Sequence, residues 1–251
     1  MDLGLDGRVY VLTGASRGLG FATAAALVAD GARVVISARD ADAVNDAVSR
    51  LGDHAHGLAV DLADPAAAQA LVDAATTRFG RIDGALISVG GPPLGGSLEI
   101  TDELWRASFE TVFLGAVRTA RTVAGALTEG GAIAFVASNS VRSPISGLGI
   151  SNGLRPGLAM VAKEMADELG PRGIRVLSLL PGRILTDRLR QLFASSADPA
   201  AEEAKSANAI PLRRVGTPEE FGRVAAFVLS PAASFLTGLA LPVDGGAMRT
   251  P

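Results

Sequence analysis

Cysteine is absent from this 251-residue chain, and tyrosine, tryptophan and lysine are nearly absent. Without cysteine the protein has no disulfide, no thiolate metal ligand and no thiol nucleophile. The only tyrosine is Tyr10 and the only lysines are Lys163 and Lys205, whereas arginine is abundant. Catalysis that depends on a phenol or a primary amine therefore has very few residues to use.

Long apolar runs and blocks of like charge are also missing. No segment reaches the length of a membrane span, and no charged-then-apolar start indicates a signal peptide. The net charge is −3 with both signs mixed, so no basic surface for nucleic acid is indicated. His54 and His56 precede the third expected strand without a carboxylate or cysteine at ligand spacing, so we expect no metal site. We expect a cytoplasmic protein that binds neither nucleic acid nor membrane.

The residues that are plentiful suit one α/β domain. Apolar residues make up 48% of the chain and are spread evenly, which is enough for a large core. Short β-rich segments alternate with alanine-rich helical segments, without repeats or a linker. We predict a single-domain Rossmann-like doubly wound parallel sheet over residues 1–251, with about seven strands and helices on both faces.

The expected elements follow from this alternation. The expected strands lie at 8–12, 31–39, 57–62, 82–87, 131–137, 175–180 and 236–243. The expected helices lie at 18–30, 41–51, 65–79, 105–127, 151–169 and 218–229. Asp64 and Thr101 are the expected caps of the third and fourth helices. Residues 187–212 are polar and rich in alanine, and we predict that they form a mobile lid over the substrate.

The segment from Thr13 to Gly20 joins the first strand to the first helix and has glycine at positions 14, 18 and 20. A strand, a glycine turn and a helix together point unpaired backbone N–H groups and the positive end of the helix dipole at a phosphate. The spacing G-x-x-x-G-x-G differs from the general dinucleotide fingerprint. The segment predicts a phosphate cradle; the alternative is a plain strand-to-helix turn with spare glycines.

This segment resembles the cofactor loop of the short-chain dehydrogenase/reductase family, and the resemblance extends through Ser138, Pro181-Gly182 and Asp244-Gly245-Gly246. It implies an NAD(P)-dependent oxidoreductase of the carbonyl reductase or 3-oxoacyl reductase type. The cofactor-binding residues that the resemblance implies are Gly14, Ser16, Arg17, Gly18, Leu19, Gly20, Arg39, Asp61, Leu62, Gly90, Pro181, Gly182 and Thr186.

The end of the second strand bears on the choice of cofactor. Ala38 stands where NAD-preferring family members carry Asp, and Arg39 follows it. An acid here binds the ribose 2′-OH, whereas arginine suits a 2′-phosphate, and Arg17 is a second cation able to reach that phosphate. We predict that NADP(H) is preferred over NAD(H); the alternative is that both arginines are solvated surface charges. Asp61 would bind the adenine amine by the same resemblance, or else cap a helix.

The family's catalytic positions hold different residues in this chain. Ser138 matches the substrate-orienting serine, but Ser151 and Arg155 stand where the family has Tyr-x-x-x-Lys, and Val112 replaces an asparagine that holds a relay water. One interpretation is a working reductase in which both serines bind the carbonyl oxygen, Arg155 stabilises the alkoxide and water delivers the proton. The other is a catalytically impaired NADP-binding homologue that acts as a sensor, scaffold or oligomer partner.

Two further arginines are candidates for binding the substrate. Arg142 follows Ser138 closely, and Arg183 follows the Pro-Gly turn directly. Clustered guanidinium groups would suit a small carbonyl compound or alcohol that carries a carboxylate or phosphate. The alternative is that they pair with acids such as Asp187 or Glu110.

The resemblance also implies a homo-oligomer, a tetramer or a dimer. Family members commonly assemble through the two long helices expected here at 105–127 and 151–169. The small residues Ala159, Ala162 and Ala166 would allow close contact between helices of two copies.

Overall fold

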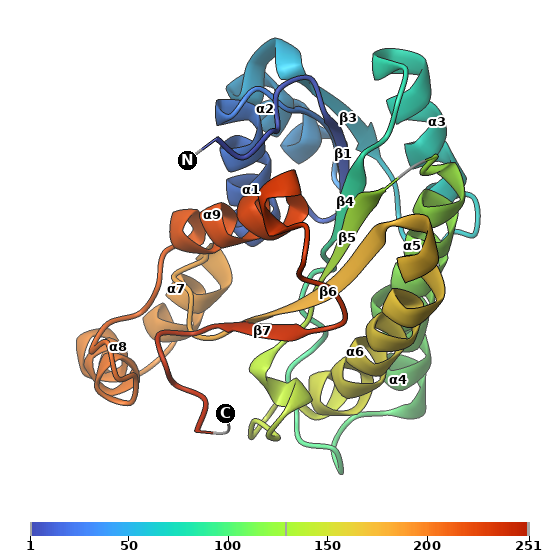
Figure 1. Cartoon of the computed structure of the whole chain (residues 1–251). Helices are drawn as coiled ribbons and strands as arrows, with labels where there is room; N and C mark the ends of the chain where they lie inside the picture. The colour runs from blue at the N-terminus through green and yellow to red at the C-terminus, as the bar shows by residue number, and fades with distance from the viewer. Residues whose placement is uncertain (1, 129, 250–251) are drawn as a thin grey trace.

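A computed structural model describes residues 2–128 and 130–249, and these residues build one parallel sheet covered by helices on both faces (Figure 1). The strands follow the order β3-β2-β1-β4-β5-β6-β7. Their bounds are β1 Val9–Leu12, β2 Arg33–Ala38, β3 Ala55–Ala59, β4 Gly84–Ile87, β5 Gly131–Val136, β6 Ile174–Pro181 and β7 Ala240–Val243. The predicted seven-stranded doubly wound fold is confirmed. Residues 1, 129, 250 and 251 of the predicted domain lie outside the described part.

The helices divide into two layers. Helices α1, α2 and α9 cover one face of the sheet, and α3, α5 and α6 cover the other (Figure 1). Their bounds are α1 Gly18–Ala29, α2 Ala41–Leu51, α3 Ala67–Phe79, α4 Asp102–Ser108, α5 Gly115–Ala126, α6 Gly149–Leu169, α7 Asp187–Ala194, α8 Pro199–Asn208 and α9 Pro218–Leu229. A π-helical segment, Phe109–Leu114, joins α4 to α5, so the long helix expected at 105–127 is built from three helical pieces.

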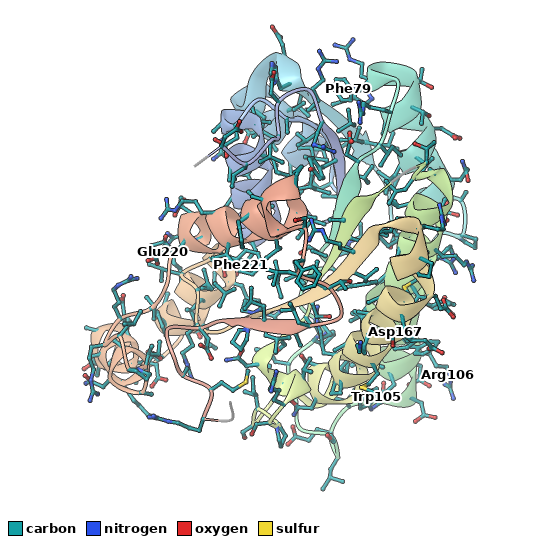
Figure 2. The ribbon with its side chains drawn as sticks, in the orientation of Figure 1. Phe79, Trp105, Arg106, Asp167, Glu220 and Phe221 are labelled. Carbon is teal, nitrogen blue, oxygen red and sulfur yellow. The ribbon has the colours of Figure 1, made fainter. Side chains whose placement is uncertain are left out.

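The core is a double layer because the side chains of each strand alternate between the two faces. In β1, Tyr10 and Leu12 pack under α1 and α9, whereas Val9 and Val11 pack under the helices of the opposite layer. A parallel sheet covered on both faces requires strands that are apolar throughout, and every residue of β1 is buried. Phe221 of α9 is fully buried on the first face (Figure 2).

Helices α1 and α9 approach each other closely through Gly222. A Cβ at this position would lie 2.5 Å from the carbonyl oxygen of Ala22 in α1. Thr217 and Glu220 form a capping box at the start of α9. Helix α9 therefore supports the helix that follows the glycine loop.

Several expected boundaries differ from the structure, at both strands and helices. Strand β7 begins at Ala240, because Gly238 N–H donates to the carbonyl of Val176 and Thr237 Oγ1 accepts from its N–H, which holds the preceding residues in a turn. Helix α3 begins at Ala67 with Ala66 as its N-cap, so the prediction that Asp64 caps it is wrong; Asp64 instead accepts from the N–H of Ala66 in the turn before the helix. His56 lies within β3 and not in the loop before it.

The predicted lid, 187–212, contains two helices, α7 and α8, which lie beside β7 and below α9 in the view of Figure 1. Thr101 caps α4 as expected, since its hydroxyl accepts from the N–H of Leu104. The mobility and the role of the lid stay predictions.

The small residues of α6 face two different ways. Ala162 and Ala166 are buried in the core of their own chain, so the prediction that they contact a second copy is wrong for these two. They lie on the side of α6 that packs on the sheet. Gly153 instead gives room to the ring of Trp105 in α4, where a Cβ would lie 2.8 Å from the ring.

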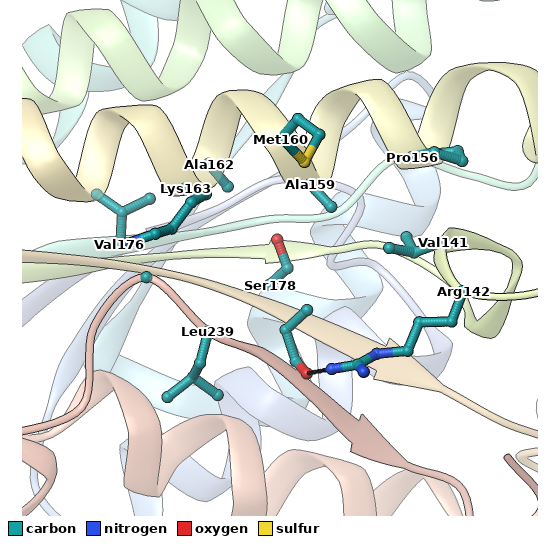
Figure 3. Close-up of a pocket in the computed structure, with 12 residues that line it drawn as sticks. Val141, Arg142, Pro156, Ala159, Met160, Ala162, Lys163, Val176, Ser178 and Leu239 are labelled. Carbon is teal, nitrogen blue, oxygen red and sulfur yellow. Dashed lines mark hydrogen bonds between the residues drawn. The ribbon is translucent and has the colours of Figure 1, made fainter. Parts of the chain in front are cut away.

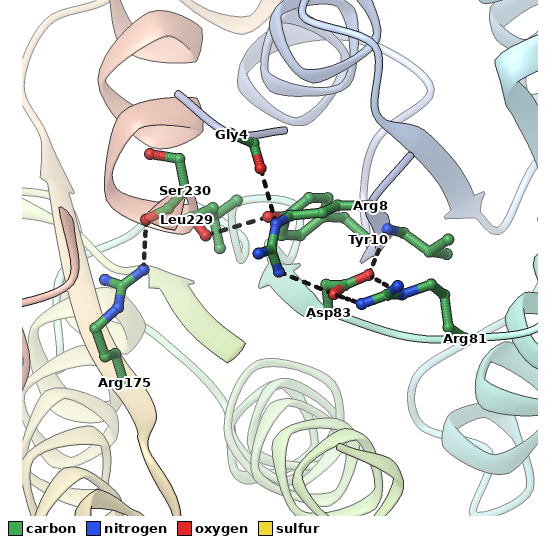
Figure 4. A network of polar contacts seen from close by, with 9 residues as sticks. Gly4, Arg8, Tyr10, Arg81, Asp83, Arg175, Leu229 and Ser230 are labelled. Carbon is green, nitrogen blue, oxygen red and sulfur yellow. Dashed lines mark hydrogen bonds and ion pairs between the residues drawn. The ribbon is translucent and has the colours of Figure 1, made fainter. Parts of the chain in front are cut away.

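A polar network ties the starts of β1 and β4 together (Figure 4). Asp83 accepts from Arg8, from Arg81 and from the backbone N–H of Val9. Nearby, the hydroxyl of Tyr10 donates to the carbonyl of Leu229 at 3.3 Å. Burial raises the pKa of Tyr10, so the only tyrosine stays neutral within the fold.

Candidate active site

The carboxyl ends of β1 and β4 border the crevice where a doubly wound sheet binds its ligand. The chain crosses from β3 on one side of β1 to β4 on the other, which leaves the loops after these two strands apart. Thr13 Oγ1 donates to the carbonyl of Ser88 at 2.8 Å and accepts from the Ser88 N–H at 3.0 Å. This reciprocal pair fixes one border of the crevice.

The glycine loop is packed so tightly that side chains do not fit. A Cβ on Gly14 would lie 2.6 Å from the carbonyl oxygen of Ser88, and Gly14 has a φ of 57°. A Cβ on Gly20 would lie 2.5 Å from the carbonyl oxygen of Gly14. Ala15 N–H donates to the carbonyl of Ser37 at 2.9 Å, which ties the loop to the end of β2.

Helix α1 begins directly after this loop without a side-chain cap. Arg17 is the N-cap residue, its side chain makes no capping bond, and the first turn holds no acid. The N–H groups of the first turn have no intrahelical partner. An anion such as a phosphate is the group that satisfies them. Ser16 is half-buried within the loop, and Leu19 packs against the core beneath it.

The two arginines predicted to choose the cofactor lie at the expected edge of the crevice. Arg17 and Arg39 are exposed, and β2 ends at Ala38 directly before Arg39. Within the described residues neither arginine is in a salt bridge. Their charges are therefore available to a ligand.

The two residues predicted to flank the adenine lie just after β3. Asp61 is exposed, and one of its carboxylate oxygens accepts from the N–H of Ala63 at 3.0 Å. Leu62 is half-buried, and its carbonyl accepts from Arg118 at 3.3 Å. Asp61 thus caps a turn and still has one carboxylate oxygen for a ligand.

The far wall of the crevice comes from β4 and β6. Gly90 follows β4, is exposed, and has open space where a Cβ would be. Pro181-Gly182 ends β6, and the Gly182 N–H donates to the carbonyl of Val243 at 3.0 Å. Thr186 faces the glycine loop, since its methyl group lies 3.5 Å from the position of a Cβ on Gly18. The segment after β6 and the glycine loop therefore face each other.

Three serines are connected by hydrogen bonds at the carboxyl end of β5. Ser138 Oγ accepts from the N–H of Ser140 at 3.1 Å. Ser140 Oγ lies 3.2 Å from Ser151 Oγ, and both residues are buried. When the Ser140 hydroxyl donates to Ser151, the Ser151 hydrogen is directed to another acceptor. Ser140 is thus a link between the two predicted serines that the sequence analysis missed.

Arg155 is a buried cation that lies one helical turn after Ser151 in α6. It is 5% exposed, and its guanidinium donates to the carbonyl of Val136 and, at 3.3 Å, to that of Val89. Burial, and then the nearby charge of Arg188, lowers its pKa to about 10, so it remains charged at neutral pH. Val112 is also buried, in the π-helical segment. The guanidinium is thus held by the strand ends β4 and β5.

The two predicted substrate arginines have hydrogen-bond partners in β7 and α8. Arg142 lines a groove between α6 and β7 and donates to the carbonyl of Ala240 at 3.4 Å (Figure 3). Arg183 donates to the hydroxyl of Ser206 in α8 at 2.8 Å. Asp187, one of the acids considered as a partner, pairs with Arg190 at 3.0 Å.

A different arginine, Arg188, lies at the mouth of the crevice, and the sequence analysis missed it. It is the second residue of α7, and its Nη2 donates to the carbonyl of Pro92 at 3.0 Å. Its guanidinium lies beside Gly91, where a Cβ would collide with it. The sequence offered one signal for Arg188, which is its position two residues after Thr186, but the segment around it was interpreted only as a lid.

No group of three or more metal-ligating side chains comes together in residues 2–128 and 130–249. No helix in this range has both the length and the apolar character needed to cross a membrane.

Comparison with known proteins identifies this arrangement. A family model described as enoyl-(acyl carrier protein) reductase, of the short-chain alcohol dehydrogenase group, matches residues 14–248. The chain belongs to the short-chain dehydrogenase/reductase family. It is 34% identical over 248 residues to an uncharacterised oxidoreductase of Methylorubrum extorquens, covering 96% of this chain and 98% of that one.

Solved structures of family members superpose over nearly the whole chain. L-sorbose reductase of Gluconobacter frateurii, in complex with NADPH and L-sorbose, matches with a TM-score of 0.94 at 31% identity and covers 100% of both chains. A 3-ketoacyl-(acyl-carrier-protein) reductase of Brucella melitensis, in complex with NADH, matches with a TM-score of 0.88 at 30% identity and covers 97% of this chain and 99% of that one. This family member is accordingly an oxidoreductase.

Proposed function

We propose that this family member is an NADPH-dependent carbonyl reductase in which serine hydroxyls and a buried guanidinium replace the usual tyrosine and lysine. The observation that carries the proposal is the uncapped start of α1 behind a loop into which no Cβ fits at Gly14 or Gly20. These features suit a dinucleotide pyrophosphate. Gly18, Gly90 and Thr186 would hold the rest of the cofactor.

The preference for NADPH is supported by charge at the end of β2. Ala38 stands where an acid would bind a ribose 2′-OH, Arg39 follows it, and Arg17 belongs to the glycine loop. Both are exposed arginines, and a guanidinium binds phosphate oxygens with two parallel hydrogen bonds. The sorbose reductase, whose structure contains NADPH, is consistent with this choice, and the reductase with NADH shows that the fold accepts either nucleotide.

The bound nicotinamide would supply the hydride, and the residues of this chain would polarise the carbonyl. The hydroxyls of Ser138 and Ser151 would donate to the carbonyl oxygen. Ser140 Oγ lies 3.2 Å from Ser151 Oγ, and a hydrogen bond donated by Ser140 would leave the Ser151 hydrogen for the carbonyl oxygen. Fixed donors that need no rearrangement stabilise a developing oxyanion by up to several kcal/mol, on the order of 3 for one donor.

Arg155 would act through its charge and not through proton transfer. Its hydrogen bonds to Val136 and Val89 hold the charge one helical turn from Ser151. A buried positive charge favours an alkoxide near it, since the effective dielectric constant there is low. The proton would come from water, because a serine hydroxyl is a poor acid. Activated carbonyl compounds such as diketones and 3-oxoacyl groups are therefore the best substrates for this site.

A nucleotide titration tests the cofactor proposal. We expect the Arg39→Ala variant to bind NADPH about 10- to 100-fold more weakly, the loss of one charge-assisted hydrogen-bond pair, with NADH binding changed by less than about threefold. The dissociation constants are measured by nucleotide fluorescence. Arg33→Ala is the matched control, because Arg33 begins the strand that Arg39 follows.

Turnover is tested separately with NADPH oxidation across ketones, diketones and 3-oxoacyl thioesters. We expect oxidation with the activated carbonyls and a loss of about tenfold or more in kcat for Ser151→Ala. Tight NADPH binding without any turnover would support the alternative of a sensor or scaffold. Absence of nucleotide binding would contradict both.

A further inference from the structure

Arg188 belongs to the predicted lid, but its side chain contacts a segment outside the lid. It lies in the first turn of α7, two residues after Thr186, and reaches back across the crevice to the carbonyl of Pro92. Its guanidinium fills the space beside Gly91, which any other residue at 91 would occupy with its Cβ. Arg188 and Gly91 are therefore matched to each other, and the pair sets the mouth of the site.

Two guanidinium groups meet the same four-residue segment from different elements. Arg155 reaches the carbonyl of Val89 from α6, and Arg188 reaches the carbonyl of Pro92 from α7. The charge of Arg188 contributes to the lowered pKa of Arg155, which shows that the two cations lie within electrostatic range of each other. Two positive charges from different helices therefore meet the segment that follows β4.

No acid of the described residues neutralises these two cations. Neither is in a salt bridge there, and Asp187, which precedes Arg188, pairs with Arg190. Two like charges held close together without a counterion destabilise each other, and the penalty is larger where one of them is buried. An anionic ligand at the mouth would remove this repulsion. Arg188 is exposed and can present its fork of N–H groups to that ligand.

We propose that Arg188 binds the carboxylate of a keto-acid substrate and so sets the specificity of the site. This proposal rests on the reductase function proposed above and names its substrate class. The carboxylate would accept two parallel hydrogen bonds from Arg188, while the keto group reaches the serines near Arg155. A neutral ketone of the same size would lack the charged contact.

The test compares keto acids with their methyl esters in the wild-type protein and in Arg188→Gln. The probes are 2-oxo, 3-oxo and 4-oxo carboxylates of four to six carbons, each with its ester. We expect Arg188→Gln to raise the KM of the acids about 10- to 100-fold and to change that of the esters by less than about threefold. Arg190→Gln is the control, because Arg190 lies two residues further along the same helix and pairs with Asp187.

A binding measurement keeps this test independent of turnover. Isothermal titration of the unreactive 2-hydroxy and 3-hydroxy carboxylates, with NADPH present and absent, should give binding that Arg188→Gln removes. If the carboxylates bind but no substrate is turned over, the proposed reductase function is contradicted and the proposed carboxylate site is not. An equal rise in KM for acids and esters would show that Arg188 only holds the lid in place. A loss of NADPH affinity would show that Arg188 contacts the cofactor. Either result, or no change in KM at all, would overturn the proposal.

Discussion

At the scale of single residues, the site depends on where side chains are missing as much as on where they are present. Gly14 and Gly20 are enclosed by backbone, Gly91 gives way to a guanidinium, and Gly90 faces open space. The first three therefore serve the packing of the loops themselves. The packing of the described residues gives no reason for glycine at 90, and we expect its role to concern the proposed cofactor.

We expect Gly90→Ala to fold as the wild type does and to lose cofactor affinity. The new methyl group meets nothing within 4 Å in the free protein, and the backbone of Gly90 is not in the left-handed region. It would stand where the nicotinamide ribose is expected to pass, so the Kd for NADPH should rise by about tenfold or more. Thermal unfolding and a fluorescence titration measure the two effects.

The control for this change is Gly125→Ala in α5. Gly125 is also exposed with open space around it, but it lies in a helix outside the crevice. Alanine there should stabilise the fold by about 0.5–1 kcal/mol, because glycine is a poor helix former, and should leave NADPH binding unchanged. An unchanged Kd for Gly90→Ala would remove Gly90 from the cofactor site.

The glycine loop was predictable from sequence, whereas Arg188 was not. The loop is local: strand, turn and helix follow one another, and their physics is complete within about a dozen residues. Arg188 is placed at the site by its contact with Gly91, which lies almost a hundred positions earlier in the chain. Arg142 and Arg183 were chosen by nearness in sequence to Ser138 and the Pro-Gly turn, and their side chains turn toward β7 and α8 instead.

At the scale of elements, α9 holds α1 in place, and its own start is held by one carboxylate. Glu220 accepts from Arg214 at 2.6 and 2.8 Å and from the N–H of Thr217 at 2.9 Å (Figure 2). The hydrogen bonds from Arg214, and then that from Thr217, lower the pKa of Glu220 to about 2. The charged form of this side chain is therefore bound more strongly in the folded state than in the unfolded state.

We expect the stability advantage of wild type over Glu220→Gln to depend on pH. A carboxyl whose pKa is depressed on folding contributes its full stability above its unfolded pKa, about 4.3. The contribution declines below that value and is gone once the pH has fallen through the folded pKa of about 2. The difference in Tm between the two proteins should thus be largest near neutral pH and should narrow in acid, over the range where both unfold reversibly.

Glu219→Gln provides the comparison for this experiment. Glu219 precedes Glu220 in the same helical turn, and its carboxylate has no hydrogen bond or salt bridge among the described residues. Its variant should follow the wild-type Tm at every pH apart from a small loss of helix-dipole interaction, on the order of 0.3–1 kcal/mol. A difference in Tm between wild type and Glu220→Gln that stays constant from neutral to acid pH would show that the Glu220 carboxylate is not bound as described.

The sequence predicted the kind of each element better than its ends. Strand β7 is shorter than its apolar run, because residues 237 and 238 hydrogen-bond to Val176 instead of joining the ladder. The segment 187–212 is predicted only as a lid, with no helix expected in it, and it contains α7 and α8. Ala162 and Ala166 were predicted to face a second copy and pack on their own sheet. Each difference depends on a tertiary contact, which periodicity along the chain does not report.

At the scale of the whole molecule, the residues that stabilise the fold and those proposed for catalysis lie at opposite ends of the sheet. The crevice lies at the carboxyl ends of the strands, and the network around Asp83 lies at their amino ends (Figure 4). Arg175 strengthens the same end by donating to the carbonyls of Val228 and Ser230, where α9 finishes. Changes at one end should therefore leave the other largely intact, as long as the sheet between them still forms.

We expect Asp83→Asn to lower stability without weakening NADPH binding. Asp83 is buried, and its two carboxylate oxygens accept from Arg8, Arg81 and the N–H of Val9 at 2.6 to 3.0 Å. An amide nitrogen cannot accept from these donors, so the unfolding free energy should fall by about 2–4 kcal/mol. Denaturant unfolding and a nucleotide titration measure the two quantities on the same samples.

The comparison for Asp83 is Asp167→Asn, which removes a salt bridge of similar length from the surface of α6. Asp167 lies 2.9 Å from Lys163, and its side chain is 70% exposed. Solvent screens this pair, so its loss should cost less than about 1 kcal/mol. An equal loss in both variants would show that burial adds nothing to the Asp83 network. A rise of more than about threefold in the NADPH Kd of Asp83→Asn would show that the two ends of the sheet are coupled.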